Sequence, residues 1–229
     1  MINLAEHFWV APKIWPGQTV FIIGGGPSLK GFNWDLIKQF RCIGCNDAYQ
    51  LGSWVDVCCF GDLTWYNIHY KETIDTEDRG IIPGLKKFGG LIVSCNPELN
   101  GLPYLHCMAR RPRGFSIRPF EVAWNCNTGS ASINLAYHLG AKRAVLLGFD
   151  MRFSNDGENN WHYNLKDPDQ KTTYPGIHKK FQDHFIYMER ERKAKVGDSF
   201  EVLNATPGSE LDVFPKVKLE DILAEEKVV

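Results

Sequence analysis

Three consecutive glycines near the start of the chain have the spacing that backbone recognition of a phosphate requires. They lie directly after the apolar, β-branched run of residues 19–23, in the segment Gly24-Gly25-Gly26-Pro27-Ser28-Leu29. A strand, a glycine turn and a helix in this order present backbone N–H groups to an anion, and glycine allows a close approach because it has no Cβ. Ser28 adds a hydroxyl donor. The segment predicts a phosphate or nucleotide site, with a plain tight turn as the alternative, although it matches neither GxGxxG nor GxxxxGK[ST].

A second candidate anion site precedes an apolar helical pattern over residues 131–139. Its sequence is Asn127-Thr128-Gly129-Ser130. The first N–H groups of a helix have no partner within the helix, and with two hydroxyls beside them they can bind an anion. Ordinary N-capping of the helix is the alternative interpretation.

Carboxylate and amide side chains follow the other expected strands. Asn46 and Asp47 follow residues 41–44, and Asp62 follows residues 55–60. Later strands are followed by Asn96, by Asp150 and by Arg152. Because ligands of parallel sheets bind beyond the carboxyl ends of the strands, these side chains predict one polar ligand-binding edge. Each aspartate could act as a general base, bind ribose hydroxyls or ligate a metal, and helix capping is the alternative for each.

Histidines cluster in the sequence around the polar stretch of residues 151–176. His162, His178 and His184 belong to this group. An imidazole is the natural base for deprotonating a hydroxyl near neutral pH, and a structural role is the alternative for each ring. His178 and His184 are six residues apart, which does not place two zinc ligands on one helix face. The sequence Asp167-Pro168-Asp169 has the bare DxD pattern of metal-dependent glycosyltransferases, but it lies in a loop and not at a strand end.

The elements that must position these residues alternate along the chain. We expect strands at residues 19–23, 41–44, 55–60, 90–95, 143–147 and 200–203, and helices at residues 30–40, 131–139, 178–195 and 219–225. Residues 96–125 are expected to be irregular. Alternation of this kind predicts an α/β, Rossmann-like, doubly wound and mostly parallel sheet with helices on both faces. We expect residues 1–229 to form a single nucleotide-binding domain, with residues 151–176 as a lid loop.

Composition narrows the class of protein. The chain has 229 residues, 44% of them hydrophobic, and a formal net charge of −1, so no overall charge favours nucleic acid or an acidic membrane. It has no signal-peptide pattern and no apolar run of membrane-spanning length, which predicts a cytoplasmic protein. Seven cysteines are scattered along it. Cys42 and Cys45 fall on opposite faces of an expected strand, which favours reduced core thiols over a zinc site.

Several of these motifs together resemble one enzyme family. The run of residues 20–29 is similar to the opening strand and Asn-Gly-Pro-Ser-Leu turn of the bacterial family-42 sialyltransferases, with Gly25 where that family has asparagine. The same opening resembles 6-hydroxymethylpterin diphosphokinase-like proteins and phage proteins of similar length. Residues 45–47, 128–150, 174–178 and 204–209 resemble later sialyltransferase motifs in the same order.

This resemblance implies a Rossmann-like transferase that uses a nucleotide-sugar donor and needs no metal. Carried over by position, the nucleotide and its phosphate would be lined by Gly24, Gly26, Ser28, Asn46, Thr128 and Gly129. His178 would be the general base on the acceptor hydroxyl. Two tyrosines stabilise the leaving phosphate in the sialyltransferases; here Arg152 takes one of those positions and Tyr163 is the candidate for the other.

The sequence thus predicts a metal-independent glycosyltransferase-like enzyme with His178, Arg152 and Tyr163 as catalytic residues. Its expected substrate is a nucleotide-activated sugar such as a CMP- or UDP-sugar, with no further cofactor. The acceptor stays open between a glycan, a protein and a modified DNA base, and a homo-oligomer is possible. One alternative is a Mg²⁺-dependent pterin or nucleoside diphosphokinase with Asp47, Asp62 or Asp150 as metal ligand. Another is a phage protein that binds a nucleotide or nucleotide sugar without catalysis.

Overall fold

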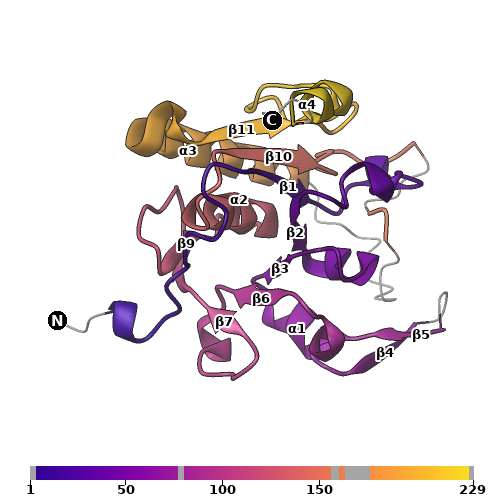
Figure 1. Cartoon of the computed structure of the whole chain (residues 1–229), viewed down its shortest axis with the longest axis vertical. Coiled ribbons are helices and arrows are strands. Elements are labelled where there is room, and N and C mark those ends of the chain that lie inside the picture. Colours follow the sequence, from indigo (N-terminus) through magenta and orange to yellow (C-terminus); the bar gives the residue numbers. More distant parts are fainter. Residues whose placement is uncertain (1–3, 77–79, 156–159, 163–175, 227–229) are drawn as a thin grey trace.

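A central parallel sheet organises the computed structural model, which describes residues 4–76, 80–155, 160–162 and 176–226. Within these residues seven strands pair in the order β11-β10-β1-β2-β3-β6-β7, and every pair is parallel (Figure 1). The bounds of these strands are β1 Thr19–Ile23, β2 Arg41–Cys45, β3 Val57–Phe60, β6 Leu91–Ser94, β7 His106–Cys107, β10 Arg143–Leu147 and β11 Glu201–Asn204. The expected doubly wound α/β sheet is confirmed.

Burial explains why the strands are nearly continuous apolar runs. All five residues of β1 are buried, as are the last four of β2 and of β10. A parallel sheet is covered on both faces, so its strands do not alternate between apolar and polar residues. Successive residues of β1 still separate by face: Val20 and Ile22 belong to one apolar cluster, and Phe21 and Ile23 to another.

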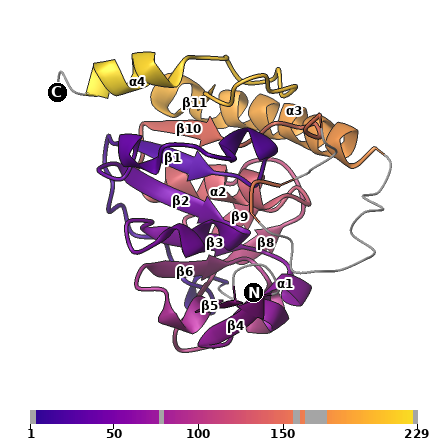
Figure 2. The same ribbon diagram turned by 90° about the vertical axis from the view of Figure 1, so that its right-hand side faces the viewer.

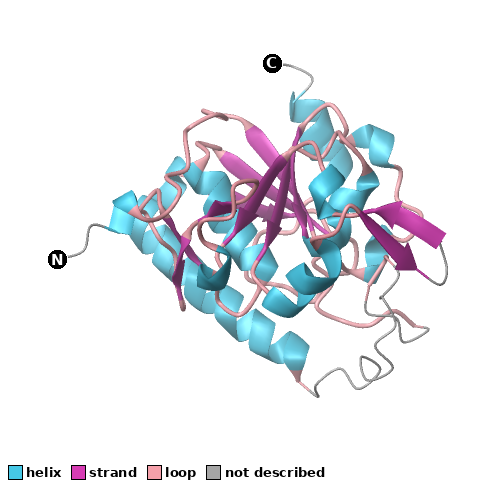
Figure 3. Ribbon diagram, turned by 90° about the horizontal axis from the view of Figure 1, so that it is seen from below, coloured by secondary structure: helices cyan, strands magenta, loops and turns pink. Residues whose placement is uncertain are grey.

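Helices cover both faces of the sheet (Figures 2 and 3). One face packs against α2 (Thr128–His138) and α3 (Ile177–Val196). The other packs against α4 (Leu219–Glu226) beside β1 and β10, and against α1 (Leu63–His69) beside β3 and β6. No described helix is both long and apolar enough to cross a membrane.

Short elements connect this framework. β4 (Thr73–Thr76) and β5 (Gly80–Pro83) form an antiparallel hairpin, and β8 (Ala109–Arg111) and β9 (Glu121–Ala123) form a parallel pair. Residues 96–125 therefore contain strands, and the expectation that they are irregular is wrong in part. Within the described residues the 3₁₀ turns are Leu4–Glu6, Pro27–Leu29, Trp34–Leu36, Asn46–Leu51, Leu85–Lys87, Pro97–Leu99 and Gly197–Ser199.

The helix expected at residues 30–40 is wrong. One 3₁₀ turn, Pro27–Leu29, ends just before this region, and a second, Trp34–Leu36, lies within it. Gly31 between them has a left-handed φ of 74°, which an α-helix does not contain. The Asn33 side chain then accepts a hydrogen bond from the Asp35 N–H and starts the second turn. Apolar spacing suggested a helix, but the glycine and the asparagine interrupt it.

The buried side chain of Asn134 in α2 binds the backbone of the preceding segment. The Asn134 Oδ1 atom accepts hydrogen bonds from the Ser116 and Ala123 N–H groups, each at 2.9 Å, and its Nδ2 donates to the Ser116 carbonyl. One fully buried amide therefore replaces three backbone partners that a regular sheet would have supplied.

We expect Asn134→Ala to lower the free energy of unfolding by about 2–4 kcal/mol, because it leaves three buried backbone groups without a partner. Urea unfolding followed by circular dichroism measures this change. The matched control is Asn100→Ala, whose exposed side chain makes one hydrogen bond to the His7 carbonyl, with an expected change within about 0.5 kcal/mol. Equal losses in the two variants would show that the Asn134 network does not stabilise the fold.

Candidate functional site

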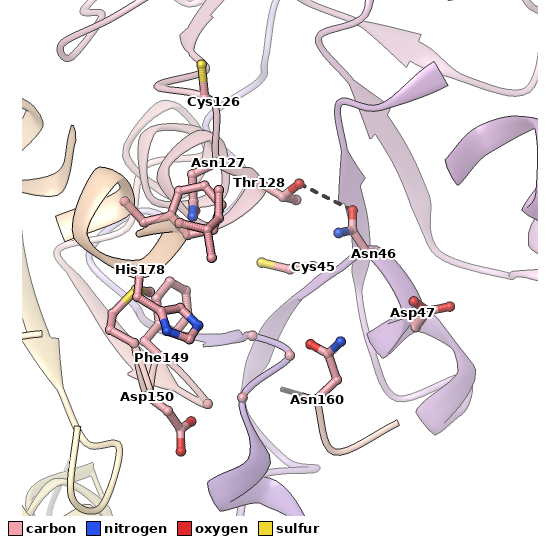
Figure 4. A pocket seen from close by; sticks show the side chains of 18 of the residues that line it. Cys45, Asn46, Asp47, Cys126, Asn127, Thr128, Phe149, Asp150, Asn160 and His178 are labelled. Atoms are coloured by element: carbon pink, nitrogen blue, oxygen red, sulfur yellow. Dashed lines mark hydrogen bonds between the residues drawn. The ribbon is translucent and has the colours of Figure 1, made fainter. Parts of the chain in front are cut away.

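A cavity of about 420 Å³ lies at the carboxyl ends of the strands, beside the point where the strand order reverses. β1 continues to β2 on one side of it, whereas β10 and β11 lie on the other. Open α/β sheets bind ligands at such a switch point. The predicted site residues that line the cavity are Gly24, Gly25, Gly26, Asn46, Asp47, Asp62, Asn127, Thr128, Gly129, Asp150, Arg152, His162 and His178. Figure 4 shows the side chains of Asn46, Asp47, Asn127, Thr128, Asp150 and His178 around this cavity.

The backbone of the glycine turn contacts protein groups, whereas the sequence predicted that it contacts a phosphate. The Gly24 N–H donates to the Leu147 carbonyl at 2.7 Å, and the Gly26 N–H donates to the Gly148 carbonyl at 2.8 Å. A Cβ on Gly26 would lie 1.8 Å from Asp150 Oδ2. The absence of Cβ therefore serves the contact between the loops that follow β1 and β10, in addition to any approach of a ligand.

Ser28 binds Asp150 and does not line the cavity. Its N–H donates to Asp150 Oδ1 at 3.0 Å and its hydroxyl donates to Asp150 Oδ2 at 2.8 Å. Burial raises the pKa of Asp150, and these two hydrogen bonds together with the Arg152 charge act in the opposite direction. The carboxylate thus takes the two donors that the sequence assigned to a phosphate.

Asn46 connects the end of β2 to the start of α2 through a hydrogen bond of its side chain. Its backbone has a left-handed φ of 51°, and its Oδ1 accepts a hydrogen bond from the Thr128 hydroxyl at 3.3 Å. In Figure 4 the Asn46 amide points into the cavity beside Thr128. Asn127 caps α2 by accepting from the Ser130 N–H, so Thr128 and Gly129 stand at the cavity wall at the helix N-terminus. Dipole and N–H groups there favour an anion.

Asp62 follows β3 and lies at the wall near two tryptophans, Trp65 and Trp124. Burial raises the pKa of Asp62, and the nearby Arg110 guanidinium acts in the opposite direction. That guanidinium stacks 4.8 Å from the centre of the Trp124 ring, and a Cβ on Gly61 would lie only 2.2 Å from the same ring. This end of the cavity is therefore aromatic and carboxylate-bearing.

The histidines have separate positions. His178 lines the cavity at the start of α3, with its ring centre 4.7 Å from that of Phe153. Burial lowers the pKa of His178, and the negative charges of Glu210 and Asp150 act in the opposite direction. His184 is buried, with Nδ1 2.6 Å from the Asn125 carbonyl, and does not line the cavity. His162 does line it. Tyr163 lies outside the described residues.

Backbone strain gathers around the cavity. The described non-glycine residues with left-handed φ are Asn46, Asn125, Cys126 and Met151, and all but Asn125 line it. Such conformations cost free energy and concentrate at functional sites. Sequence reasoning missed Cys126 and Met151, because neither residue type signals a positive φ. It also missed the wall residues Trp65, Trp124 and Asn160, which come from separate elements and share no motif.

The described residues contain no group of three or more His, Cys, Asp or Glu side chains arranged to hold a metal ion. Asp167 and Asp169 of the DxD pattern, and most of the expected lid at residues 151–176, lie outside those residues. Arg152 is half-buried at the wall, and its Nε donates to the Gly208 carbonyl at 2.8 Å.

Two solved glycosyltransferases share this fold. One is the MAf glycosyltransferase from Magnetospirillum magneticum AMB-1, with a TM-score of 0.54 and 13% identity over 97% of this chain and 38% of that chain. The other is the sialyltransferase CstII from Campylobacter jejuni, in complex with the substrate analogue cytidine-5′-monophosphate, with a TM-score of 0.53 and 16% identity over 88% of this chain and 85% of that chain. This chain thus spans about two fifths of the MAf enzyme. No protein-family model and no curated protein sequence matches it.

We expect Gly26→Ala to lower the free energy of unfolding by about 1–3 kcal/mol, because the added Cβ displaces the Asp150 carboxylate and separates two loops. Urea unfolding measures the change. Gly89→Ala is the matched control, since its Cβ would meet nothing within 4 Å, and its effect should stay within about 0.5 kcal/mol. A Gly26 variant as stable as the Gly89 variant would contradict the close contact.

Proposed function

We propose that this protein is a glycosyltransferase that moves a sugar from a nucleotide-activated donor to an acceptor hydroxyl. The observation that carries the proposal is the cavity at the switch point, which is lined by a glycine turn, a helix N-terminus and the His178 imidazole. The fold shared with two glycosyltransferases supports it, because their chemistry suits this set of groups.

In the proposed reaction His178 takes the proton of the acceptor hydroxyl while the acceptor oxygen forms a bond to the sugar carbon. The bond from that carbon to the phosphate oxygen breaks, and the phosphate keeps its electron pair. Arg152, at the cavity wall, stabilises the negative charge that develops on the phosphate. The first N–H groups of α2 and the Asn46 amide bind the nucleotide portion.

CMP- and UDP-sugars are the donors to test first. The CstII structure holds cytidine-5′-monophosphate, which supports trying the cytidine series. The cavity walls also carry Asp47, Asp62 and Asp150, the carboxylates predicted from the sequence as possible Mg²⁺ ligands, so a Mg²⁺-dependent diphosphokinase is the second candidate to test. Turnover of ATP that a chelator abolishes would support the kinase, and nucleotide-sugar turnover insensitive to a chelator would support the transferase. Nucleotide binding with neither turnover would leave a non-catalytic binding protein.

Replacement of the proposed base should separate binding from chemistry. We expect His178→Ala to lower the rate of nucleotide release from the donor sugar about 10²–10⁴-fold and to leave nucleotide affinity within about twofold. Transfer to water allows this measurement without a known acceptor. His7→Ala, at an exposed position, is the control and should leave both quantities unchanged. Full turnover in the His178 variant would remove the assigned role.

The pH profile gives an independent check on His178. Burial disfavours the protonated ring and lowers its pKa below the usual 6.5. The neutral base therefore persists to lower pH, and kcat/KM should fall only as the pH drops through a value below 6.5. The falling limb should disappear in His178→Ala. A limb with its midpoint well above 6.5 would contradict the assignment.

A further inference from the structure

Residues 160–162 lie against the glycine turn, and Asn160 and His162 line the cavity. The Trp161 N–H donates to the Gly25 carbonyl, and its indole Nε1–H donates to the Gly24 carbonyl, both at 2.9 Å. The Trp161 ring packs against the apolar cluster under the turn, with its centre 5.4 Å from that of Trp34. Two hydrogen bonds and an aromatic contact thus fix the backbone that carries the next residue, His162.

His162 stands between the glycine turn and Asp47. Its Nδ1 is 3.6 Å from Asp47 Oδ2, and its Nε2 would lie 3.3 Å from a Cβ on Gly25. Asp47 is itself held in place, because its Oδ1 is 3.2 Å from His69 Nε2 and its Oδ2 accepts from Trp65 Nε1 at 3.4 Å. The Nδ1 atom of His162 therefore faces a fixed negative charge, while Nε2 is the ring atom that lies beside the glycine turn.

The cavity therefore has imidazoles on two different walls. Figure 4 places His178 on one side and Asp47, the partner of His162, on the other. Transfer between two oxygen atoms needs a base at the attacking oxygen and a donor at the departing oxygen. His178 serves the first role in the proposed function. His162 lies over the glycine turn, the segment that the sequence predicts to hold a phosphate, and it lines the same cavity as His178 and Arg152.

We propose that His162 donates a hydrogen bond from Nε2 to the phosphate of the donor nucleotide and stabilises it as the leaving group, and that Asp47 is the positioning residue for this ring. This inference rests on the proposed function. The bond between sugar and phosphate oxygen breaks with its electrons on the phosphate, the acceptor proton moves to His178, and His162 keeps its own proton. Gly25 leaves the space that the ring needs.

The experiment measures how much the phosphate adds to affinity. Calorimetry compares CMP with cytidine and UDP with uridine. In each pair, the dissociation constant of the nucleoside divided by that of the nucleotide gives the contribution of the phosphate to affinity. We expect His162→Ala to reduce this ratio about 10- to 100-fold, the value of a hydrogen bond to a charged group. Nucleoside affinity should stay unchanged. His7→Ala is the control, and His178→Ala should leave the ratio intact.

Two further variants test the pairing. Asp47→Asn should reduce the ratio by a smaller factor, and in the background of His162→Ala it should reduce it no further, because Asp47 acts only through the ring. His162→Gln, which retains a donor, should recover part of the loss. Thermal melting identifies any variant that fails to fold.

The outcomes separate this inference from the proposed function. A wild-type protein that binds neither nucleotide removes both. A wild-type protein that turns over the donor sugar, with an unchanged phosphate ratio in His162→Ala, removes the role of His162 alone. If that variant loses turnover while its ratio is unchanged, His162 acts at the acceptor, and the assignment to the phosphate is wrong.

Discussion

The contact between the loops after β1 and β10 is the constraint on which the rest of the site depends. These strands are neighbours, but their chains continue to opposite sides of the sheet, which opens a crevice between them. Backbone hydrogen bonds from Gly24 and Gly26, and the two hydrogen bonds that Ser28 donates to Asp150, hold the two loops together. These two loops form one side of the cavity, and the other lining residues lie around them.

Glycine recurs in these loops because other protein atoms, and not only a ligand, occupy the space that a Cβ would fill. A Cβ on Gly26 would meet Asp150, one on Gly25 would meet Asn160 and His162, and one on Gly129 would lie 2.4 Å from the Phe149 ring. The loop after β10 supplies the partner in each case. The glycines therefore let the segment after β10 pack against both the turn at residues 24–26 and the start of α2. This explains why two glycine motifs that are distant in the sequence line a single cavity.

Sequence patterns predicted the sheet well because each buried strand is one continuous apolar run, as in β1 and β10. They also predicted which strand ends meet, since parallel strands bring their carboxyl ends to one edge. They failed where individual residues interrupt an apolar pattern: with Gly31 and Asn33 present, a 3₁₀ turn at Trp34–Leu36 takes the place of the expected helix. The pairing of Asp47 with His162 joins residues 115 positions apart, and no local spacing encodes it.

Three carboxylates in the cavity wall would repel a phosphate unless each were compensated. Asp47 faces two imidazoles and an indole N–H, and Asp150 accepts two hydrogen bonds from Ser28. Asp62 lies near the Arg110 guanidinium, and burial raises the pKa of its carboxyl. Because each carboxylate has a hydrogen-bond donor or a positive charge nearby, the α2 N-terminus and Arg152 remain to attract an anion, together with the proposed donor His162.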